Sequence, residues 1–262
     1  MTAPVKYVVD SAVATITLDR PDAMNSLDTD TKLALRDHVL RAASDPEVRA
    51  VVLTGAGRAF CVGQDLREHA DALAAGSADL GQTVRDHYNP IVTTLATMPK
   101  PVVAAVNGIA AGAGAAFAFA CDLRVVADSA GFNLAFAAIG LSCDSGSSWT
   151  LPRLVGWARA RELLLIPRTV TADEAQALGL ATEVVPADIV VDRATELARQ
   201  FAAGPTQAYA AIREVLEYSA THTLAESVAT EAALMGRTGA TEDHRGAVTS
   251  FLTKQPPTFA GQ

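Results

Sequence analysis

The chain has 262 residues, of which 50% are apolar and 19% are charged, and its formal net charge is −8. This composition supports the core of one large domain and argues against a disordered chain. The acidic balance, without any run of five basic residues, argues against nucleic acid as a partner, because phosphate binding needs clustered Lys and Arg. The cysteines are odd in number and have no C-x-x-C spacing, which argues against a disulfide framework or a metal site and indicates a reducing, cytoplasmic location.

One uncharged stretch, residues 101–121, is long enough to span a bilayer. Asn107-Gly108 interrupts it in the middle, and Gly112 and Gly114 follow closely. A buried strand, a turn and a buried helix account for this pattern better than a membrane span. Residues 1–10 lack a basic segment followed by an apolar one, so no secretory signal is expected.

The order of the predicted elements is a β/α core followed by helices. Strands are expected at 5–10, 13–19, 50–54, 102–106 and 123–127. Helices are expected from the N-cap Asp28 to about 43, after Asp65, and at 83–97, 112–120, 147–155, 158–166 and 171–179. Three further helices and no strand are expected after residue 188. The predicted organisation is therefore an α/β core over 1–195 and a helical region over 196–262.

Two segments have the form strand, glycine-rich turn, helix: one runs through Gly63-Gln64-Asp65 and the other through Gly112-Ala113-Gly114. Such turns leave a backbone N–H unpaired at the start of a helix, here at Gln64 and Ala113. Two N–H groups that converge on one oxygen stabilise an oxyanion, as acyl-transfer and enolate-forming enzymes require. The alternative is that the glycines only permit tight turns and close packing. A dinucleotide-binding fingerprint fits badly, because Phe117 occupies the place of its third glycine.

Asp144 is the only acid-base group in its loop, and the two expected pocket walls contribute no histidine and only Asp65. A single carboxylate predicts proton transfer within a substrate rather than the addition of water. A competing interpretation makes Asp144 a helix N-cap, since Ser and Gly follow it, and Asp65 is interpreted as the cap of the helix it opens. An apolar wall would raise the pKa of Asp144, whereas a helix N-terminus would lower it. The expected wall residues are Phe132, Phe136, Ile139 and Trp149.

These segments, with Thr17-Leu18-Asp19-Arg20-Pro21 and Asn25 upstream and the motif Ala172–Pro186 downstream, resemble the crotonase superfamily (the enoyl-CoA hydratase/isomerase family) over nearly the whole chain. The resemblance implies a crotonase-like ββα-spiral core with a C-terminal helical region that packs on neighbouring subunits in a homotrimer or hexamer. It also implies an acyl-CoA thioester substrate, whose carbonyl oxygen the N–H groups of Gln64 and Ala113 would hold. No metal and no cofactor other than the coenzyme A of the substrate are implied.

Among members of the family that the chain resembles, the acidic residues of the site determine whether the reaction is hydration or isomerisation. Hydratases of the family carry two glutamates, and the corresponding positions here hold Ala116 and Phe136. The loop of Asp144 and the segment 148–160 resemble most the ring-1,2-epoxyphenylacetyl-CoA isomerases of phenylacetate breakdown, which like Δ3,Δ2-enoyl-CoA isomerases use one aspartate. Ser142-Cys143 departs from the usual hydrophobic residue and proline before that aspartate. The resemblance implies that Asp144 removes the α-proton of the thioester and returns it to the γ-carbon.

The resemblance further implies a set of residues that contact the acyl-CoA. They are Ala23, Met24, Phe60, Val62, Asp65, Leu66, Gly112, Phe136, Ile139, Trp149, Phe251 and Lys254. The last two lie in the C-terminal tail and would reach the coenzyme A from an adjacent subunit. Three other functions remain open: a hydratase with altered acids, an enzyme whose Asp144 attacks an aryl-CoA as in the related dehalogenases, and a non-catalytic acyl-CoA binder.

Overall fold

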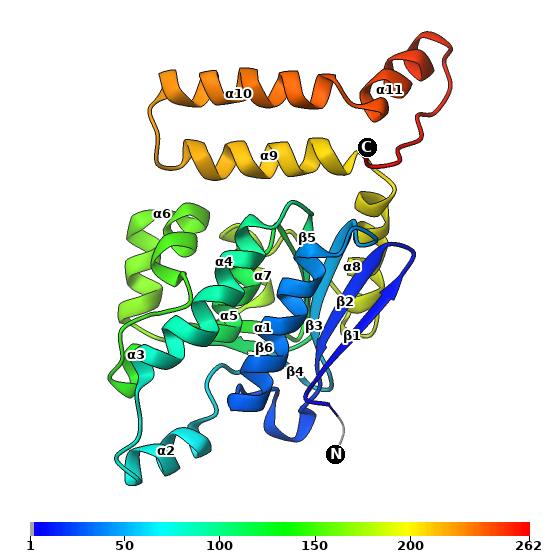
Figure 1. The fold of residues 1–262 in the computed structure, drawn as a ribbon. Helices are drawn as coiled ribbons and strands as arrows, with labels where there is room; N and C mark the ends of the chain where they lie inside the picture. Colours follow the sequence, from blue (N-terminus) through cyan, green and yellow to red (C-terminus); the bar gives the residue numbers. More distant parts are fainter. Residues whose placement is uncertain (1–2) are drawn as a thin grey trace.

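The structure, a computed structural model, describes residues 3–262, and its larger sheet has six strands in the order β1-β2-β3-β5-β7-β10 (Figure 1). Their bounds are β1 Val5–Asp10, β2 Val13–Leu18, β3 Ala50–Gly55, β5 Val102–Val106, β7 Leu123–Ala127 and β10 Glu183–Val185. β1 and β2 form the predicted antiparallel hairpin, and the other pairs are parallel. β3 and β5 are buried at every residue, which explains their unbroken apolar sequences.

A smaller sheet has four strands in the order β4-β6-β8-β9. Their bounds are β4 Ala59–Cys61, β6 Ile109–Ala111, β8 Gly131–Asn133 and β9 Thr169–Thr171. Three times in succession the chain gives one strand to the larger sheet and the next to the smaller one, as β3 then β4, β5 then β6, and β7 then β8. This repetition is the ββα spiral that the resemblance to the crotonase superfamily implied. The smaller sheet itself was not predicted, because three-residue strands show no periodic pattern.

Helices surround the two sheets. Their bounds are α1 Thr29–Ser44, α2 Leu66–Ala74, α3 Leu80–Thr83, α4 Asn89–Thr97, α5 Ala113–Ala120, α6 Ser147–Leu165, α7 Ala172–Ala177, α8 Val190–Ala202, α9 Thr206–Ser219, α10 Leu224–Gly239 and α11 Glu242–Leu252. Short turns of 3-10 helix occupy η1 Pro21–Ala23, η3 Ala137–Ile139 and η4 Ala187–Ile189, and a π-helical turn, η2 Val84–Tyr88, precedes α4. Asp28 caps α1 as predicted, and Gly156 breaks α6 into the two predicted helices.

The uncharged stretch forms β5, β6 and α5, as the sequence indicated. All eight residues of α5 are buried, and the helix packs on β4, β6, α4 and α6. Its alanines and phenylalanines give it apolar side chains on every face, so it needs no contact with water. Among residues 3–262, no helix combines the length and the hydropathy that a membrane span requires.

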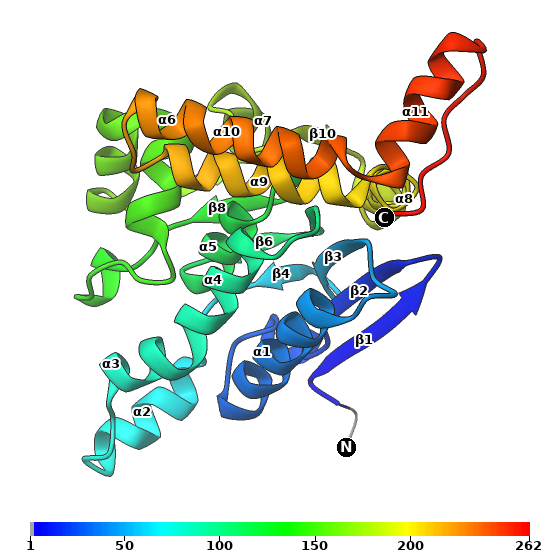
Figure 2. The same cartoon turned by 45° about the horizontal axis from the view of Figure 1, so that its top comes forward.

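The C-terminal part contains four helices within the described residues, so the prediction of three after residue 188 was wrong. α8 packs on β3, β5 and β7 of the larger sheet, and the predicted boundary at residue 195 therefore falls inside α8. α9 and α10 lie side by side over one end of the core, and α11 follows at their edge (Figures 1 and 2). Buried Arg213 ties α9 to the core by donating to the carbonyl oxygens of Met98 (2.9 Å) and Leu95 (2.8 Å).

Candidate active site

The first predicted oxyanion donor, Gln64, lies in the loop between β4 and α2. Leu27 forms a parallel bridge with it: the Leu27 N–H donates to Gly63 O at 2.8 Å, and the Asp65 N–H donates to Leu27 O at 3.1 Å. The two bonds are made by Gly63 and Asp65, the residues on either side of Gln64. In a parallel bridge of this kind, the N–H and C=O of the residue between them point away from the partner strand. The N–H of Gln64 is therefore directed away from Leu27 and remains available to a ligand.

The second predicted donor, Ala113, is the first residue of α5, so its N–H has no partner within the helix. The two turns touch each other: a Cβ on Gly63 would come within 3.0 Å of Ala111 O and 3.3 Å of Ala113 N. Phe136 covers the same turn, since its Cε1 would lie 3.9 Å from a Cβ on Gly112. The structure thus brings the two glycine-rich turns together, as the sequence predicted.

Asp144 lies in the loop before α6, and its side chain does not cap that helix. The N-cap position belongs to Gly146, whereas Asp144 offers only its main-chain oxygen to Ser147 N–H at 2.9 Å. The Ser145 hydroxyl donates to Asp144 Oδ1 at 2.7 Å. Burial raises the pKa of the Asp144 carboxyl, and the bond from Ser145 lowers it by less. The interpretation of the Asp144 side chain as a helix N-cap is therefore wrong, and the pKa of its carboxyl is raised.

Tyr88, at the end of the π-helical turn, bonds to the Gln64 side chain and lies within range of the Asp144 charge. Its hydroxyl donates to Gln64 Oε1, and only 2% of the residue is exposed. Burial raises the pKa of Tyr88, and the negative charge of nearby Asp144 raises it further. The Asp144 loop itself packs on α4 through Gly146: a Cβ added to Gly146 would lie 3.2 Å from Val92 Cγ2. Sequence analysis missed Tyr88, because nothing local separates it from an ordinary helix residue.

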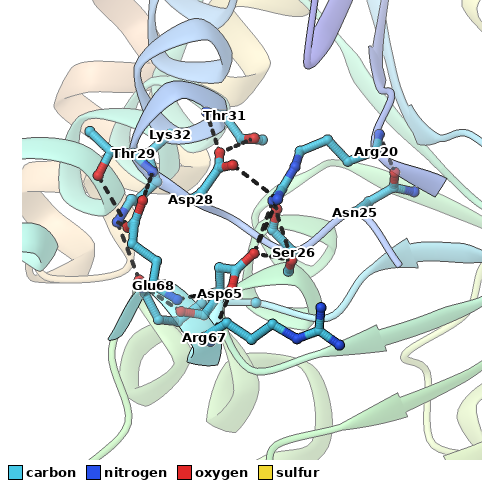
Figure 3. A network of polar contacts seen from close by, with 12 residues as sticks. Arg20, Asn25, Ser26, Asp28, Thr29, Thr31, Lys32, Asp65, Arg67 and Glu68 are labelled. Carbon is cyan, nitrogen blue, oxygen red and sulfur yellow. Dashed lines mark hydrogen bonds and ion pairs between the residues drawn. The ribbon is translucent and has the colours of Figure 1, made fainter. Parts of the chain in front are cut away.

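Asp65 is a structural residue, as its interpretation as a helix cap predicted (Figure 3). Its carboxylate accepts bonds from the N–H groups of Arg67 (3.1 Å) and Glu68 (3.3 Å). Ser26 Oγ at 2.8 Å and the Arg20 guanidinium at 3.2 Å complete its contacts. Burial acts to raise the pKa of Asp65, but these hydrogen bonds outweigh it and hold the pKa below its usual range.

We expect Asp65→Ala to lower the free energy of unfolding by about 1–3 kcal/mol, because the change removes a helix cap and one of the two carboxylates that pair with Arg20, leaving Asp28 as the other. Thermal or urea unfolding measures the effect. Asp71→Ala, an exposed position of the same helix, serves as control and should change stability by less than about 0.5 kcal/mol. Equal stability of the two variants would contradict the structural role of Asp65.

An open groove of about 910 Å³ lies in this part of the molecule, and Gln64 is one of the residues that line it. Five of the predicted contact residues line it: Ala23, Met24, Val62, Asp65 and Leu66. Arg20, Arg58 and Arg67 line it as well, which the sequence did not indicate. Of these, Arg20 is engaged by Asp28 and Asp65. Exposed guanidinium groups at Arg58 and Arg67 suit the phosphates of a nucleotide-like ligand.

Other predicted contact residues lie elsewhere. Phe60 is fully buried in the core, and Phe132 is also buried and packs on Phe119 with ring centroids 4.9 Å apart, so neither side chain lines the groove that contains Gln64. Ile139 is 53% exposed, and the Trp149 ring is covered by the Arg153 guanidinium at 3.9 Å.

The two predicted residues of the C-terminal tail also lie away from the groove. Phe251 is 83% exposed at the end of α11, and Lys254 follows it. α11 and α2 lie at opposite ends of the molecule in both views (Figures 1 and 2). One chain therefore does not bring these two residues to the groove that contains Gln64.

Comparison with known proteins gives a consistent result. The sequence model of the family described as enoyl-CoA hydratase/isomerase matches residues 9–262. The chain is 39% identical to the 1,2-epoxyphenylacetyl-CoA isomerase of Escherichia coli, with 97% of each chain covered. It is 42% identical to a probable enoyl-CoA hydratase of Rhodobacter capsulatus, with 98% of each covered. A crystal structure of an enoyl-CoA hydratase/isomerase from Mycobacterium abscessus superposes with a TM-score of 0.95 at 43% identity, covering 98% of this chain and 100% of that one. The chain belongs to the enoyl-CoA hydratase/isomerase family, within the crotonase superfamily.

Proposed function

We propose that the protein is an acyl-CoA isomerase that shifts a double bond, or isomerises a ring epoxide, with Asp144 as its single acid-base. The observation that carries this proposal is the half-buried Asp144 carboxyl in the loop before α6, which accepts a hydrogen bond from Ser145 and whose pKa is raised by partial burial. The positions that correspond to the two hydratase glutamates hold Ala116, fully buried, and Phe136, 7% exposed. Neither side chain is able to activate a water molecule. The name of the Escherichia coli relative supports an epoxide substrate as one possibility.

In this mechanism the N–H groups of Gln64 and Ala113 hold the thioester carbonyl oxygen. Asp144 removes a proton from the α-carbon, and the electron pair moves onto the carbonyl oxygen, where the two N–H groups stabilise the enolate. The protonated Asp144 then returns the proton to the γ-carbon, and the double bond moves into conjugation with the thioester. The same carboxyl is base and then acid, so the raised pKa favours both steps. The reaction uses no cofactor beyond the coenzyme A of the substrate.

A hydratase is the second candidate, because several relatives carry that name, including the Rhodobacter capsulatus protein. Product analysis with a 3-enoyl-CoA and, separately, a 2-enoyl-CoA distinguishes the two reactions. We expect the 3-enoyl ester to become the 2-enoyl ester, and the 2-enoyl ester to remain without added water. Formation of the 3-hydroxyacyl ester alone would reject the isomerase.

We expect Ser145→Ala to shift the acid limb of the kcat–pH profile to higher pH. The Ser145 hydroxyl stabilises the ionised carboxyl, so its removal raises the pKa of Asp144 further. Because the carboxylate is the active form, the variant loses activity first at acidic pH, by about two- to tenfold if the bond contributes 0.5–1.5 kcal/mol. Ser148→Ala, at an exposed position of the same segment, is the control. Superposable profiles for Ser145→Ala and wild type would contradict the assignment.

We further propose that residues 196–262 contact neighbouring copies in a homotrimer or hexamer, and that Phe251 and Lys254 reach the groove of an adjacent subunit. Large apolar side chains on these helices support this: Leu216 is 65% exposed, Leu224 79% and Met235 73%. Light scattering tests the oligomeric state, and a monomer at micromolar concentration would contradict this proposal.

We also propose the cytoplasm as the location of the protein. The cysteines Cys61, Cys121 and Cys143 are free thiols, which fits a reducing compartment.

A further inference from the structure

The side chain of Gln64 is held by two buried donors. The Tyr88 hydroxyl and the Lys32 ammonium both donate to its Oε1, Lys32 Nζ at 3.5 Å. Lys32 and Tyr88 are each only 2% exposed. Lys32 also pairs with Glu68 at 3.3 Å (Figure 3). Burying an ammonium group destabilises the fold unless the group is paired, and the contacts of Lys32 with Gln64 and Glu68 offset this cost.

The three residues come from three different elements. Lys32 lies in the first turn of α1, Gln64 in the loop before α2, and Tyr88 at the end of the π-helical turn η2. Single π turns often occur at functional sites. The Tyr88 ring also contacts Phe117 of α5 edge-on, with centroids 5.9 Å apart. Tyr88 therefore touches both Gln64 and the helix whose first residue is Ala113.

Tyr88 is suited to act as a permanent donor. Burial raises the pKa of its hydroxyl, and the charges of Asp144, Cys61 and Glu68 raise it further. A raised pKa favours the protonated hydroxyl, which is the form that donates the hydrogen bond to Gln64. The proton that the proposed reaction moves belongs to Asp144, so Tyr88 has a different task.

We infer that Tyr88 and Lys32 are positioning residues that hold the Gln64 side chain and thereby fix the backbone N–H of Gln64 toward the thioester carbonyl oxygen. The inference rests on the proposed function, in which that N–H stabilises the enolate. The bridge to Leu27 restrains the backbone of Gln64 on one side, and the two side-chain bonds restrain it on the other. Preorganised donors are effective because they need no rearrangement when the charge develops.

Kinetics of Tyr88→Phe, Lys32→Met, Gln64→Ala and the double variant Tyr88→Phe/Gln64→Ala test the inference. Gln64→Ala keeps the backbone N–H and removes only the held side chain. Each single variant is expected to lower kcat by about tenfold, with KM changed less than about threefold. The double variant is expected to equal Gln64→Ala, because Tyr88 acts through Gln64. Effects that multiply, or a wild-type kcat in Tyr88→Phe, would overturn the inference.

A second readout does not depend on turnover. Bound cinnamoyl-CoA reports the polarisation of its thioester carbonyl through its absorbance maximum and its carbonyl stretching frequency. We expect Tyr88→Phe and Gln64→Ala to reduce the shift that wild type induces. Tyr7→Phe is the matched control, since the Tyr7 hydroxyl is buried without a hydrogen-bond partner among the described residues.

The two readouts separate the two claims. An unchanged carbonyl shift in both Tyr88→Phe and Gln64→Ala would overturn the positioning role, whatever the enzyme catalyses. A reduced shift in these variants, together with no isomer formed by wild type, would support the positioning role and reject the proposed reaction. A shift reduced equally in Tyr7→Phe would show a general loss of packing and would also overturn the inference.

Discussion

Asp144→Asn is expected to lower kcat for the double-bond shift by about a thousandfold, because the amide is unable to accept the α-proton and general acid–base catalysis contributes roughly 10²–10⁴-fold. The amide has the same shape as the carboxyl, so KM should change little. Steady-state kinetics with a 3-enoyl-CoA measures both constants. Activity within tenfold of wild type would mean that another group removes the proton.

The same substitution is expected to increase stability at neutral pH. Burial raises the pKa of Asp144 in the folded chain above its value in the unfolded chain. The folded state therefore binds its proton more tightly, and stability falls as pH rises from the ordinary carboxyl range through the raised pKa. Asparagine carries no charge, so it avoids the cost of burying an ionised carboxyl. The free energy of unfolding of the variant should therefore be higher by about 1 kcal/mol at pH 7, and this difference should disappear below the ordinary carboxyl pKa. Thermal unfolding at several pH values checks it, and a lower Tm of the variant at pH 7 would contradict it.

Gly63→Ala is the second change with a large expected effect, about 10²–10³-fold in kcat, the cost of losing one oxyanion donor. The new Cβ would lie 3.0 Å from Ala111 O and 3.3 Å from Ala113 N, between the two turns that carry the donors. Gly63 also has φ +81°, which disfavours any residue with a Cβ. We therefore expect a loss of stability as well, of about 1–2 kcal/mol.

Gly179→Ala distinguishes the two possible causes of lost activity in Gly63→Ala, which are obstruction of the oxyanion donors and backbone strain. Gly179 has φ +79°, and the nearest atom to its Cβ would be Leu154 O at an ordinary 3.8 Å. This variant carries the same backbone strain outside the site, so its stability should fall similarly while its kcat stays at the wild-type value. Equal loss of activity in both glycine variants would show that strain, and not the obstruction of the donors, is the cause.

The larger sheet was predictable because its central strands are buried on both faces. Strands such as β3 and β5 then consist of continuous apolar runs that end in glycine-rich turns. The number of C-terminal helices was harder to predict, because helix ends there lack clear signals: no glycine or proline lies between α9 and α10, where residues 220–223 are Ala-Thr-His-Thr. The signal that was available is the capping box of Thr223 with Glu226, which opens α10.

The candidate site was predictable where local sequence determines the geometry. Ala113 follows a glycine as the first residue of α5, and that position alone leaves its N–H without a partner in the helix. Gln64 also follows a glycine, but its N–H is directed by the bridge to Leu27, which the sequence did not indicate. Tyr88 and Lys32 meet Gln64 across 24 and 32 residues of chain, and only the packing of α1 and η2 brings them there. The direction of the pKa shift of Asp144 could likewise not be predicted from the sequence. Burial raises this pKa and a helix N-terminus lowers it, and which effect applies depends on where α6 begins.

The most direct test of a single-carboxylate mechanism follows one hydrogen. A 3-enoyl-CoA labelled with deuterium at the α-carbon is converted in ordinary water, and the 2-enoyl product is examined for deuterium at the γ-carbon. If Asp144 both removes and returns the proton, a measurable fraction of product carries the label at the γ-carbon, and Asp144→Asn forms none. A γ-carbon that holds only solvent hydrogen, or labelled product from Asp144→Asn at the wild-type rate, would contradict the mechanism.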